Sequence, residues 1–191
     1  MNIAHSIQQS IFLKQQLSEN QNFLDKIEQS IALLVDSLRH NGKIHFCGNG
    51  GSAADAQHLA AELSGRFYFN RPPLNAEALH CNSSYLTAVA NDYGYEHIFA
   101  RLLEASAHAG DILVAFSTSG NSENILKAID VAHQKRLKVI AFTGETGGKM
   151  AEMVDILLNV PSTDTPRIQE IHILIGHIIC EHVEKQMFPN S

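Results

Sequence analysis

The sequence has no surplus of positive charge. Its 14 lysine and arginine residues are outnumbered by 20 aspartate and glutamate residues, which gives a formal net charge of -6. A protein that binds nucleic acid regardless of sequence needs a basic face that displaces counterions from the phosphates. The charge balance therefore argues against that class of protein.

Cysteines and long apolar runs are also scarce. Cys47, Cys81 and Cys180 are far apart and show no CxxC pairing, so we expect buried thiols in a reducing compartment. The most apolar segment, residues 171–180, has about half the length needed to span a bilayer and should be a buried helix. Because residues 1–10 lack a basic cluster followed by an apolar stretch, we expect no secretory signal and a cytoplasmic protein.

Length and composition predict one domain. A chain of 191 residues with 45% hydrophobic content can bury one substantial core. The sequence shows no internal repeat and no low-complexity linker. We predict a single domain over residues 1–191, made of N-terminal helices (1–41), an α/β core (42–162) and a C-terminal helix (165–188).

Short apolar runs alternate with helical segments through the core. Before it, apolar residues recur at helical spacing from Phe12 to Arg39, and Asn41-Gly42 forms a helix stop. Five strands are expected at residues 43–47, 76–80, 111–116, 138–142 and 156–160, with helices at 52–64, 84–90 and 122–134. Strands separated by such helices pair in parallel and are covered on both faces. We therefore predict an α/β fold, a three-layer α/β/α sandwich with a central five-stranded parallel sheet.

A long C-terminal helix is expected over residues 166–187. Pro166 lies in its first turn, where a missing N–H group costs nothing. The middle of this helix is apolar nearly all round, so more than one of its faces must be covered. Burial in a subunit interface would cover them, and we therefore expect a homo-oligomer.

Two loops rich in glycine and hydroxyl groups follow predicted strands, at residues 48–52 and 117–122. In a parallel sheet, ligands bind beyond the carboxyl ends of the strands, where helix N-termini present free N–H groups. Glycines let the backbone approach a ligand, and serine, threonine and asparagine side chains add donors. Either loop alone also fits an ordinary strand-to-helix turn. Together they predict a site for a phosphorylated sugar.

Two nucleotide-binding patterns are incomplete or missing. Residues 48–53 formally match G-x-G-x-x-A after a strand. The acidic residue that should end the next strand is not there, because Glu77 lies inside that strand. The Walker pattern G-x-x-x-x-G-K-[ST] does not occur. A dinucleotide or nucleoside triphosphate site is therefore not expected.

The two loops, and further segments at residues 53–66, 90–94 and 167–172, resemble the phosphoheptose isomerases of the sugar isomerase (SIS) family. The resemblance extends along nearly the whole chain and implies the SIS fold. It also implies that serines of the second loop hold a sugar phosphate. The substrate-binding residues that it implies are Asn49, Gly50, Gly51, Ser52, Glu62, Asn91, Asp92, Ser117, Thr118, Ser119, Ser122 and Gln169.

Glu62 and His177 are the predicted acid/base pair. Interconversion of a ketose and an aldose moves one proton between C1 and C2 and another between their oxygens, which requires an acid and a base near those atoms. His58 and Glu62 are four residues apart on the helix after the first loop, so they share a face. His177 could alternatively be an ordinary interface histidine. We interpret His172 as a structural histidine.

The resemblance implies one zinc ion per subunit, held by His58, Glu62, Gln169 and His177. Two imidazoles, a carboxylate and an amide oxygen form a plausible ligand set for a divalent metal. With metal bound, either Glu62 leaves it during the cycle or the metal acts by polarising the sugar oxygens. The sequence leaves both possibilities open.

The spacing on the last helix suggests an active site shared between subunits. Gln169 and His177 are eight residues apart, which is about 12 Å along a helix axis. Ligand atoms of one ion must lie within about 2 Å of it. We therefore predict a homo-oligomer, for which the resemblance implies a tetramer, with Glu62 and His177 of one site supplied by different chains.

Three functions remain open at this point. The first is conversion of sedoheptulose 7-phosphate to D-glycero-D-manno-heptose 7-phosphate, on the way to the heptose of the lipopolysaccharide core. The second is a non-catalytic regulator of the same fold that binds a replication initiator. The third is an isomerase or sensor of another sugar phosphate. Retention of Glu62 and His177 favours an enzyme.

Overall fold

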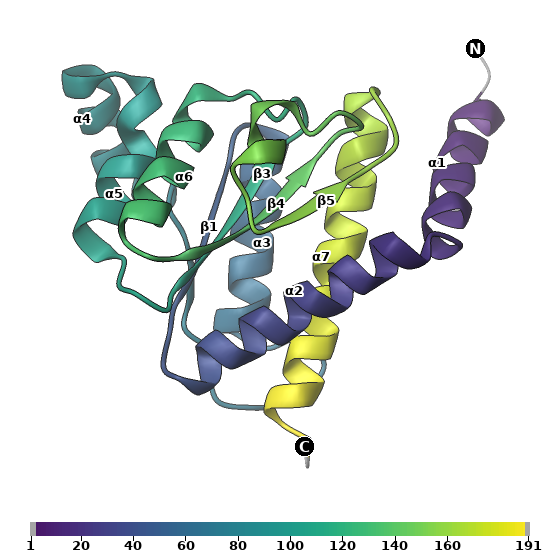
Figure 1. The fold of residues 1–191 in the computed structure, drawn as a ribbon, viewed down its shortest axis with the longest axis horizontal. Coiled ribbons are helices and arrows are strands. Elements are labelled where there is room, and N and C mark those ends of the chain that lie inside the picture. Colours follow the sequence, from purple (N-terminus) through teal and green to yellow (C-terminus); the bar gives the residue numbers. More distant parts are fainter. Residues whose placement is uncertain (1–2, 190–191) are drawn as a thin grey trace.

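The computed structural model describes residues 3–189. Its centre is a five-stranded parallel sheet with the strand order β2-β1-β3-β4-β5 (Figure 1). The strands are β1 Ile44–Gly48, β2 Ala76–Ala78, β3 Ile112–Ser117, β4 Lys138–Thr143 and β5 Ile156–Asn159. The predicted fold class is confirmed, and β2, which ends at Ala78, differs most from its predicted bounds.

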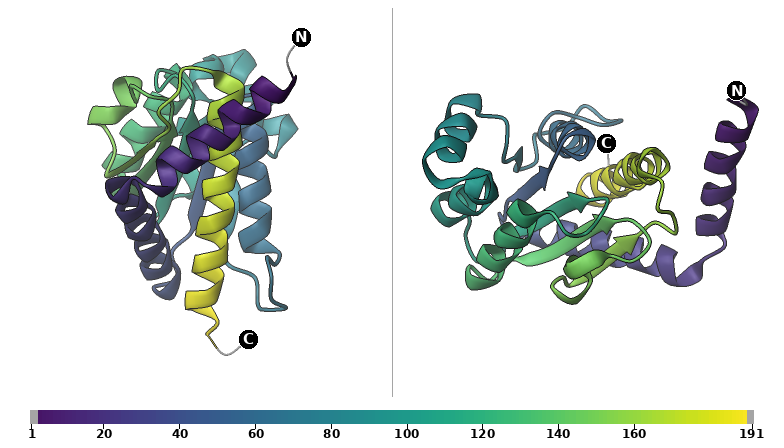
Figure 2. Two further views of the ribbon diagram at one scale, coloured as in Figure 1. Left: turned by 90° about the vertical axis from the view of Figure 1, so that its right-hand side faces the viewer. Right: turned by 90° about the horizontal axis from the view of Figure 1, so that it is seen from above.

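Helices cover both faces of the sheet (Figure 2). The α-helices are α1 Ile3–Ser18, α2 Gln21–Arg39, α3 Gly51–Ser64, α4 Ser83–Tyr93, α5 Ile98–Ser106, α6 Glu123–Gln134 and α7 Thr165–Met187. Two short 3-10 helices are η1 Tyr95–His97 and η2 Gly148–Glu152. Helix α5 is absent from the sequence-based prediction, which left the region between α4 and β3 unassigned.

Alternate side chains of the strands enter two separate cores. In β3, Ile112, Val114 and Phe116 join the core formed with α1, α2, α3 and α7. Their neighbours Leu113 and Ala115 join the core formed with α4, α5 and α6. Because both faces of the strand are buried, its sequence is a continuous apolar run rather than an alternating one. The three-layer arrangement follows directly.

Helices α3 and α7 lie against each other and run in the same direction, from the carboxyl edge of the sheet downward in Figure 1. Their contact is close at Gly176, where an added Cβ would lie 2.4 Å from the Leu59 Cδ1 atom. At the upper end, a Cβ on Gly51 would lie 2.5 Å from the Gln169 amide nitrogen. The start of α7 is therefore held beside the first loop.

The cysteines agree with the prediction in two of three cases. Cys47 and Cys180 are buried free thiols, whereas Cys81 is exposed. Because β2 ends at Ala78, Cys81 lies in the turn that follows the strand, so the prediction of burial is wrong there. Among the described residues, no helix has both the length and the apolar character needed to cross a membrane.

Candidate active site

The two predicted ligand loops lie side by side at the carboxyl edge of the sheet. Strands β1 and β3 are neighbours, but the chain leaves β1 toward β2 and leaves β3 toward β4. Open parallel sheets bind ligands where successive connections diverge in this way. Asn49 of the first loop and Asn124 of α6 join the two sides, because each side-chain amide donates to the other, at 2.9 and 2.8 Å.

The first loop is shaped by its glycines. Gly50 has a φ of 55°, a left-handed conformation that side chains other than glycine rarely adopt. Gly51 is covered by Gln169, as described above, so a larger residue would displace that amide. Ser52 is buried in the first turn of α3. The loop therefore places its backbone, Asn49 and Gln169 at one point of the sheet edge.

The second loop gathers three hydroxyl groups. The Ser117 hydroxyl lies 2.9 Å from that of Ser122 and 3.5 Å from that of Ser119, while Asn121 donates its backbone N–H to the Ser119 hydroxyl. Helix α6 begins immediately after the loop, and the first N–H groups of a helix have no partner inside it. Hydroxyls, free N–H groups and the positive end of a helix dipole are suited to an anion such as phosphate.

Three of the four predicted metal ligands meet within one chain. The ligand atoms of His58, Glu62 and His177 all lie within 4.8 Å of one another. The His58 Nε2 atom is 3.0 Å from His177 Nε2 and 3.3 Å from Glu62 Oε1. A tetrahedral zinc ion with bonds of about 2.0–2.1 Å holds its ligand atoms about 3.3 Å apart. The spacing and the chemistry of these donors therefore fit zinc.

The prediction that different chains supply Glu62 and His177 is wrong, because one chain brings both together. That prediction considered only distances along α7, whereas His177 meets residues of α3. Gln169 lies two turns before His177, and its amide contacts Gly51. Its assignment as a metal ligand stays a prediction.

Asn91 and Asp92 are exposed near the end of α4, with the Asn91 amide donating to the Asp92 carboxylate at 2.8 Å. Three residues beyond Asp92, the Tyr95 hydroxyl donates to the Asn49 amide oxygen at 3.1 Å. The segment that follows α4 therefore reaches the first loop. Contact of Asn91 and Asp92 with a sugar stays a prediction.

Sequence reasoning missed Asp55, Asn124 and Tyr95. Burial raises the pKa of Asp55 to about 6, although nearby His58 lowers it. Asp55, His58 and Glu62 are spaced as i, i+3 and i+7, and this shared helical face was a signal that could have identified Asp55. Asn124 was also detectable, as a polar residue on the buried face of α6. The role of Tyr95 depends on tertiary contacts alone.

His172 lies behind the site and has a structural environment. It is fully buried, it contacts the rings of Phe116 and Phe142, and its Nε2 atom lies 3.1 Å from the Thr143 carbonyl oxygen. Burial lowers the pKa of His172 to about 4, and the hydrogen bond to Thr143 opposes this shift only in part. The imidazole is therefore neutral in the folded protein, in agreement with its interpretation as a structural histidine.

A buried ion pair anchors the loop after α3. Arg71 and Glu184 have side chains that are 0% exposed and lie 2.8 Å apart. The Glu184 carboxylate also accepts hydrogen bonds from the N–H groups of residues 67–69. This loop holds the Phe67 ring 5.8 Å from the His177 ring, so the anchor supports one wall of the possible metal-binding group formed by His58, Glu62 and His177.

A serine-lined loop and a glycine-lined loop lie together at the carboxyl edge of a parallel sheet, and a histidine–carboxylate group lies further along α3 and α7. This arrangement belongs to the SIS class of fold. The chain belongs to the SIS domain family, whose model matches residues 7–144. Within that family its relatives are phosphoheptose isomerases. One, from Sulfurimonas denitrificans, is 51% identical over 186 residues, which cover 97% of this chain and 95% of the relative.

Solved structures agree with this assignment. Phosphoheptose isomerases from Neisseria gonorrhoeae and Francisella tularensis align with TM-scores of 0.90 and 0.92, at 44% and 40% identity. Each alignment covers 96% of this chain and 97% of the other chain. The resemblance inferred from the loops and the three further segments is confirmed.

Proposed function

We propose that the protein is an aldose–ketose isomerase that converts sedoheptulose 7-phosphate to D-glycero-D-manno-heptose 7-phosphate. The observation that carries the proposal is the meeting of Glu62 and His177, in a chain whose two donor-rich loops lie together at the sheet edge and whose similar relatives are named phosphoheptose isomerases. The acid/base pair distinguishes this function from a regulator that only binds.

The second loop is assigned to the phosphate. Ser117, Thr118, Ser119 and Ser122 surround it with hydroxyl and backbone donors, and the N-terminus of α6 contributes its dipole. The first loop and its neighbours are assigned to the sugar. This set consists of Asn49, Gly50, Gly51, Ser52, Asn91, Asp92 and Gln169.

Glu62 and His177 are assigned to proton transfer. Removal of a proton from C1 of the ketose forms a C1–C2 double bond, while the C2 oxygen accepts a proton, which gives the enediol. Return of a proton to C2 and loss of the proton on O1 then give the aldehyde. Two groups that face the same two carbons can perform all four transfers, and such catalysis typically contributes about 100-fold or more to the rate.

We propose one zinc ion per subunit, with His58, Glu62 and His177 as ligands and Gln169 as the fourth. When bound there, zinc would supply polarisation of the sugar oxygens, and Glu62 would have to leave the ion whenever it transfers a proton. Elemental analysis tests this assignment without an activity assay. The wild-type protein is expected to retain one zinc per subunit, and the His58→Ala variant far less.

Aldose formation from a panel of ketose phosphates tests the function. The zinc-loaded protein should convert sedoheptulose 7-phosphate faster than pentulose or hexulose phosphates, and in D2O the product should carry deuterium at C2. Binding of sugar phosphates without turnover would instead support a regulator or sensor. Faster turnover of a smaller ketose phosphate would show that the seven-carbon assignment is wrong.

We further propose a homotetramer with active sites that a neighbouring subunit completes. Helix α1 projects from the body in Figure 1 and exposes Ile3, Ile7, Ile11 and Phe12. An apolar groove of about 500 Å³ lies between α1, α2 and α7, and the His58 side chain is 50% exposed. A second copy could cover these surfaces. Light scattering should show a tetramer for the wild-type protein and dissociation for Ile7→Asp, whereas a wild-type monomer would contradict the proposal.

The remaining assignments are cellular. We propose a cytoplasmic enzyme, organised as one domain, that supplies heptose for the lipopolysaccharide core. Free buried thiols at Cys47 and Cys180 suit a reducing compartment. Deletion of the gene should remove heptose from the lipopolysaccharide core, and an unchanged core would exclude this role.

A further inference from the structure

The side chain of Asn49 has one hydrogen-bonding position left for a ligand. Its amide oxygen accepts from the Asn124 amide at 2.8 Å and from the Tyr95 hydroxyl at 3.1 Å. Its amide nitrogen donates to the Asn124 oxygen at 2.9 Å. An amide oxygen has two lone pairs and an amide nitrogen has two hydrogens. Both acceptor positions of Asn49 are therefore occupied, and one N–H remains.

Tyr95 is the contact that favours this orientation of the amide. Asn124 is 3% exposed, so its amide has little room to turn toward solvent. In an isolated pair of amides, however, both could turn over together and exchange N for O without losing a hydrogen bond. The Tyr95 hydroxyl donates to the Asn49 oxygen. A phenol hydroxyl can also accept, but it is a stronger donor than acceptor, so it favours the state in which Asn49 presents its N–H.

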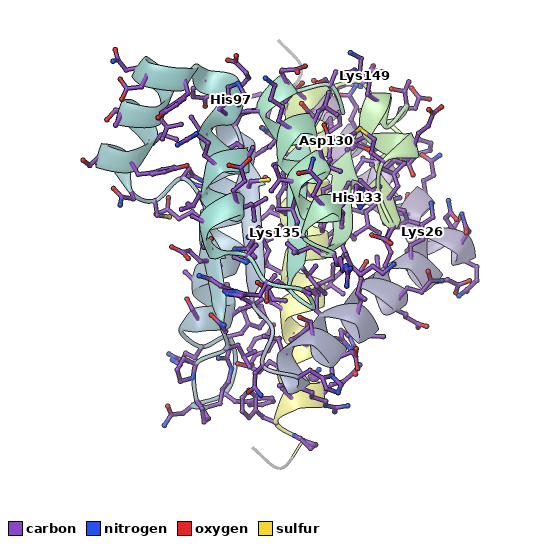
Figure 3. The ribbon with its side chains drawn as sticks, turned by 60° about the vertical axis from the view of Figure 1, so that its left-hand side comes forward. Lys26, His97, Asp130, His133, Lys135 and Lys149 are labelled. Carbon is purple, nitrogen blue, oxygen red and sulfur yellow. The ribbon has the colours of Figure 1, made fainter. Side chains whose placement is uncertain are left out.

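The backbone holds Tyr95 in place independently of its hydroxyl. Gly94, with a φ of 98°, turns the chain from α4 into η1. In η1, His97 lies with its Nε2 atom 3.2 Å from the Lys127 Nζ atom of α6. Figure 3 shows that His97 lies near the upper end of the molecule. Lys149 lies at the same end, and its backbone N–H donates to the Asn121 side chain of the second loop. Loss of the Tyr95 hydroxyl should therefore leave η1 where it is.

We propose that Tyr95 is a positioning residue of the isomerase site. Its hydroxyl holds the Asn49 amide in the orientation in which Asn49 donates a hydrogen bond to an oxygen of the sugar. This inference rests on the proposed function, because it assumes that the first loop contacts the sugar and the second loop the phosphate. The free N–H of Asn49 selects a ligand that places a hydroxyl or carbonyl oxygen, as hydrogen-bond acceptor, at this position. Phosphate alone would not require it.

The Tyr95→Phe variant tests the proposal, with Tyr93→Phe as a matched control. Both tyrosines are about half exposed, at 54% and 53%, but the Tyr93 ring packs against the Arg101 guanidinium, 3.8 Å from its centre. Calorimetry should show about 10-fold weaker binding of sedoheptulose 7-phosphate to Tyr95→Phe, the loss typical of one hydrogen bond. Binding of inorganic phosphate, the unfolding temperature and the Tyr93→Phe variant should be unchanged.

A double variant separates positioning from a general structural effect. If Tyr95 acts through Asn49, Tyr95→Phe should have no further effect on kcat/KM or on sugar-phosphate affinity in the Asn49→Ala background. Equal losses in both backgrounds, or equal losses for phosphate and for the sugar phosphate, would overturn the proposal. So would wild-type affinity of Tyr95→Phe. Absence of turnover by the wild-type protein would overturn the proposed function instead, and the binding measurements would still decide the role of Tyr95.

Discussion

The two ends of the α3–α7 pair use polar groups in opposite ways. At the lower end in Figure 1, Glu184 accepts from three backbone N–H groups and from Arg71, and Arg71 also donates to four backbone carbonyls. At the upper end, one N–H of Asn49 and the hydroxyls of the second loop remain available. The first arrangement uses its hydrogen bonds within the protein, whereas the second keeps some of them for a ligand.

This difference distinguishes polar groups that stabilise the fold from polar groups that are available to a ligand. Burial alone would raise the pKa of Glu184, but hydrogen bonds from the Phe67 and Tyr68 N–H groups and from Arg71 outweigh it, so the pKa lies below its ordinary value of 4.5. The carboxylate is therefore stable as an ion without water or ligand. Substitutions in the Arg71–Glu184 pair should accordingly affect stability, whereas substitutions of groups that are available to a ligand should affect catalysis or binding.

Glu184→Ala should give the largest effect. Removing one member of a buried ion pair leaves the other charge unpaired and typically costs about 3–5 kcal/mol of unfolding free energy. Urea unfolding should show this loss. Glu181→Ala is the control, because its pair with Lys185 is partly exposed and should contribute no more than about 1 kcal/mol. If Glu184→Ala behaved like Glu181→Ala, the lower end would not be a structural anchor.

Glu62→Gln should reduce catalysis rather than stability, although Glu62 lies in the last turn of α3 and its backbone carbonyl accepts from Arg71. We expect kcat to fall by about 100-fold or more, equivalent to about 2.7 kcal/mol, because an amide cannot act as the acid or base. The unfolding free energy should change little. Glu181→Gln makes the same chemical change at a partly exposed residue of α7 and should leave kcat unaltered. Wild-type activity of Glu62→Gln would remove the carboxylate from the mechanism.

His172, between the two ends, should make stability sensitive to acid. Its folded-state pKa of about 4 lies below the ordinary value of 6.5, so the unfolded state takes up the proton first as the pH falls. The stabilisation that the neutral His172 imidazole gives to the folded state is complete above pH 6.5 and is lost progressively as the pH falls from 6.5 to 4. From pH 7.5 to 5.0, this group should account for about 2 kcal/mol of lost unfolding free energy.

His172→Gln provides the comparison, because its amide can donate to Thr143 and does not titrate. Unfolding curves at the two pH values should show a smaller loss for this variant than for the wild-type protein. The exposed His182→Gln variant should behave like the wild type. An identical loss in all three proteins would contradict the assignment to His172.

Ser119→Ala should give the smallest effect, and it tests the assignment of the second loop to phosphate binding. A phosphate contact remote from the reacting carbons contributes similar binding to substrate and transition state. We expect KM to rise by about 10-fold, close to the value of one hydrogen bond, with kcat nearly unchanged. Steady-state kinetics over a range of substrate concentrations would reveal this. A fall in kcat at constant KM would contradict the assignment of this loop to phosphate.

Local sequence patterns were sufficient for the sheet and its ligand loops. The strands appear as apolar runs because both faces are buried, and the carboxyl ends of parallel strands meet at one edge. Helix α5 was less visible. It continues from η1, and His97 at its N-terminus provides no capping side chain among the described contacts, so the usual start signal was missing.

The site was predictable only as far as single elements allow. His58 and Glu62 follow from their spacing on one helix. The position of His177 depends on the packing of α3 against α7, for which Gly176 in the apolar middle of α7 was an available signal of close approach. The Arg71–Glu184 and Asn49–Asn124 contacts join residues 113 and 75 positions apart. Such partners cannot be paired from one sequence.

The place of α7 in the chain has a consequence for synthesis. It follows every other described element, yet Ile168, Ile171 and Val183 are in the core with α2 and α3, and His177 meets a residue 119 positions earlier. Contacts so distant along the chain slow folding. While α7 is still inside the ribosome, one apolar face of the sheet lacks part of its cover and is exposed to aggregation. The core that contains α7 and the contact between His58 and His177 are therefore completed late, after translation has passed residue 183.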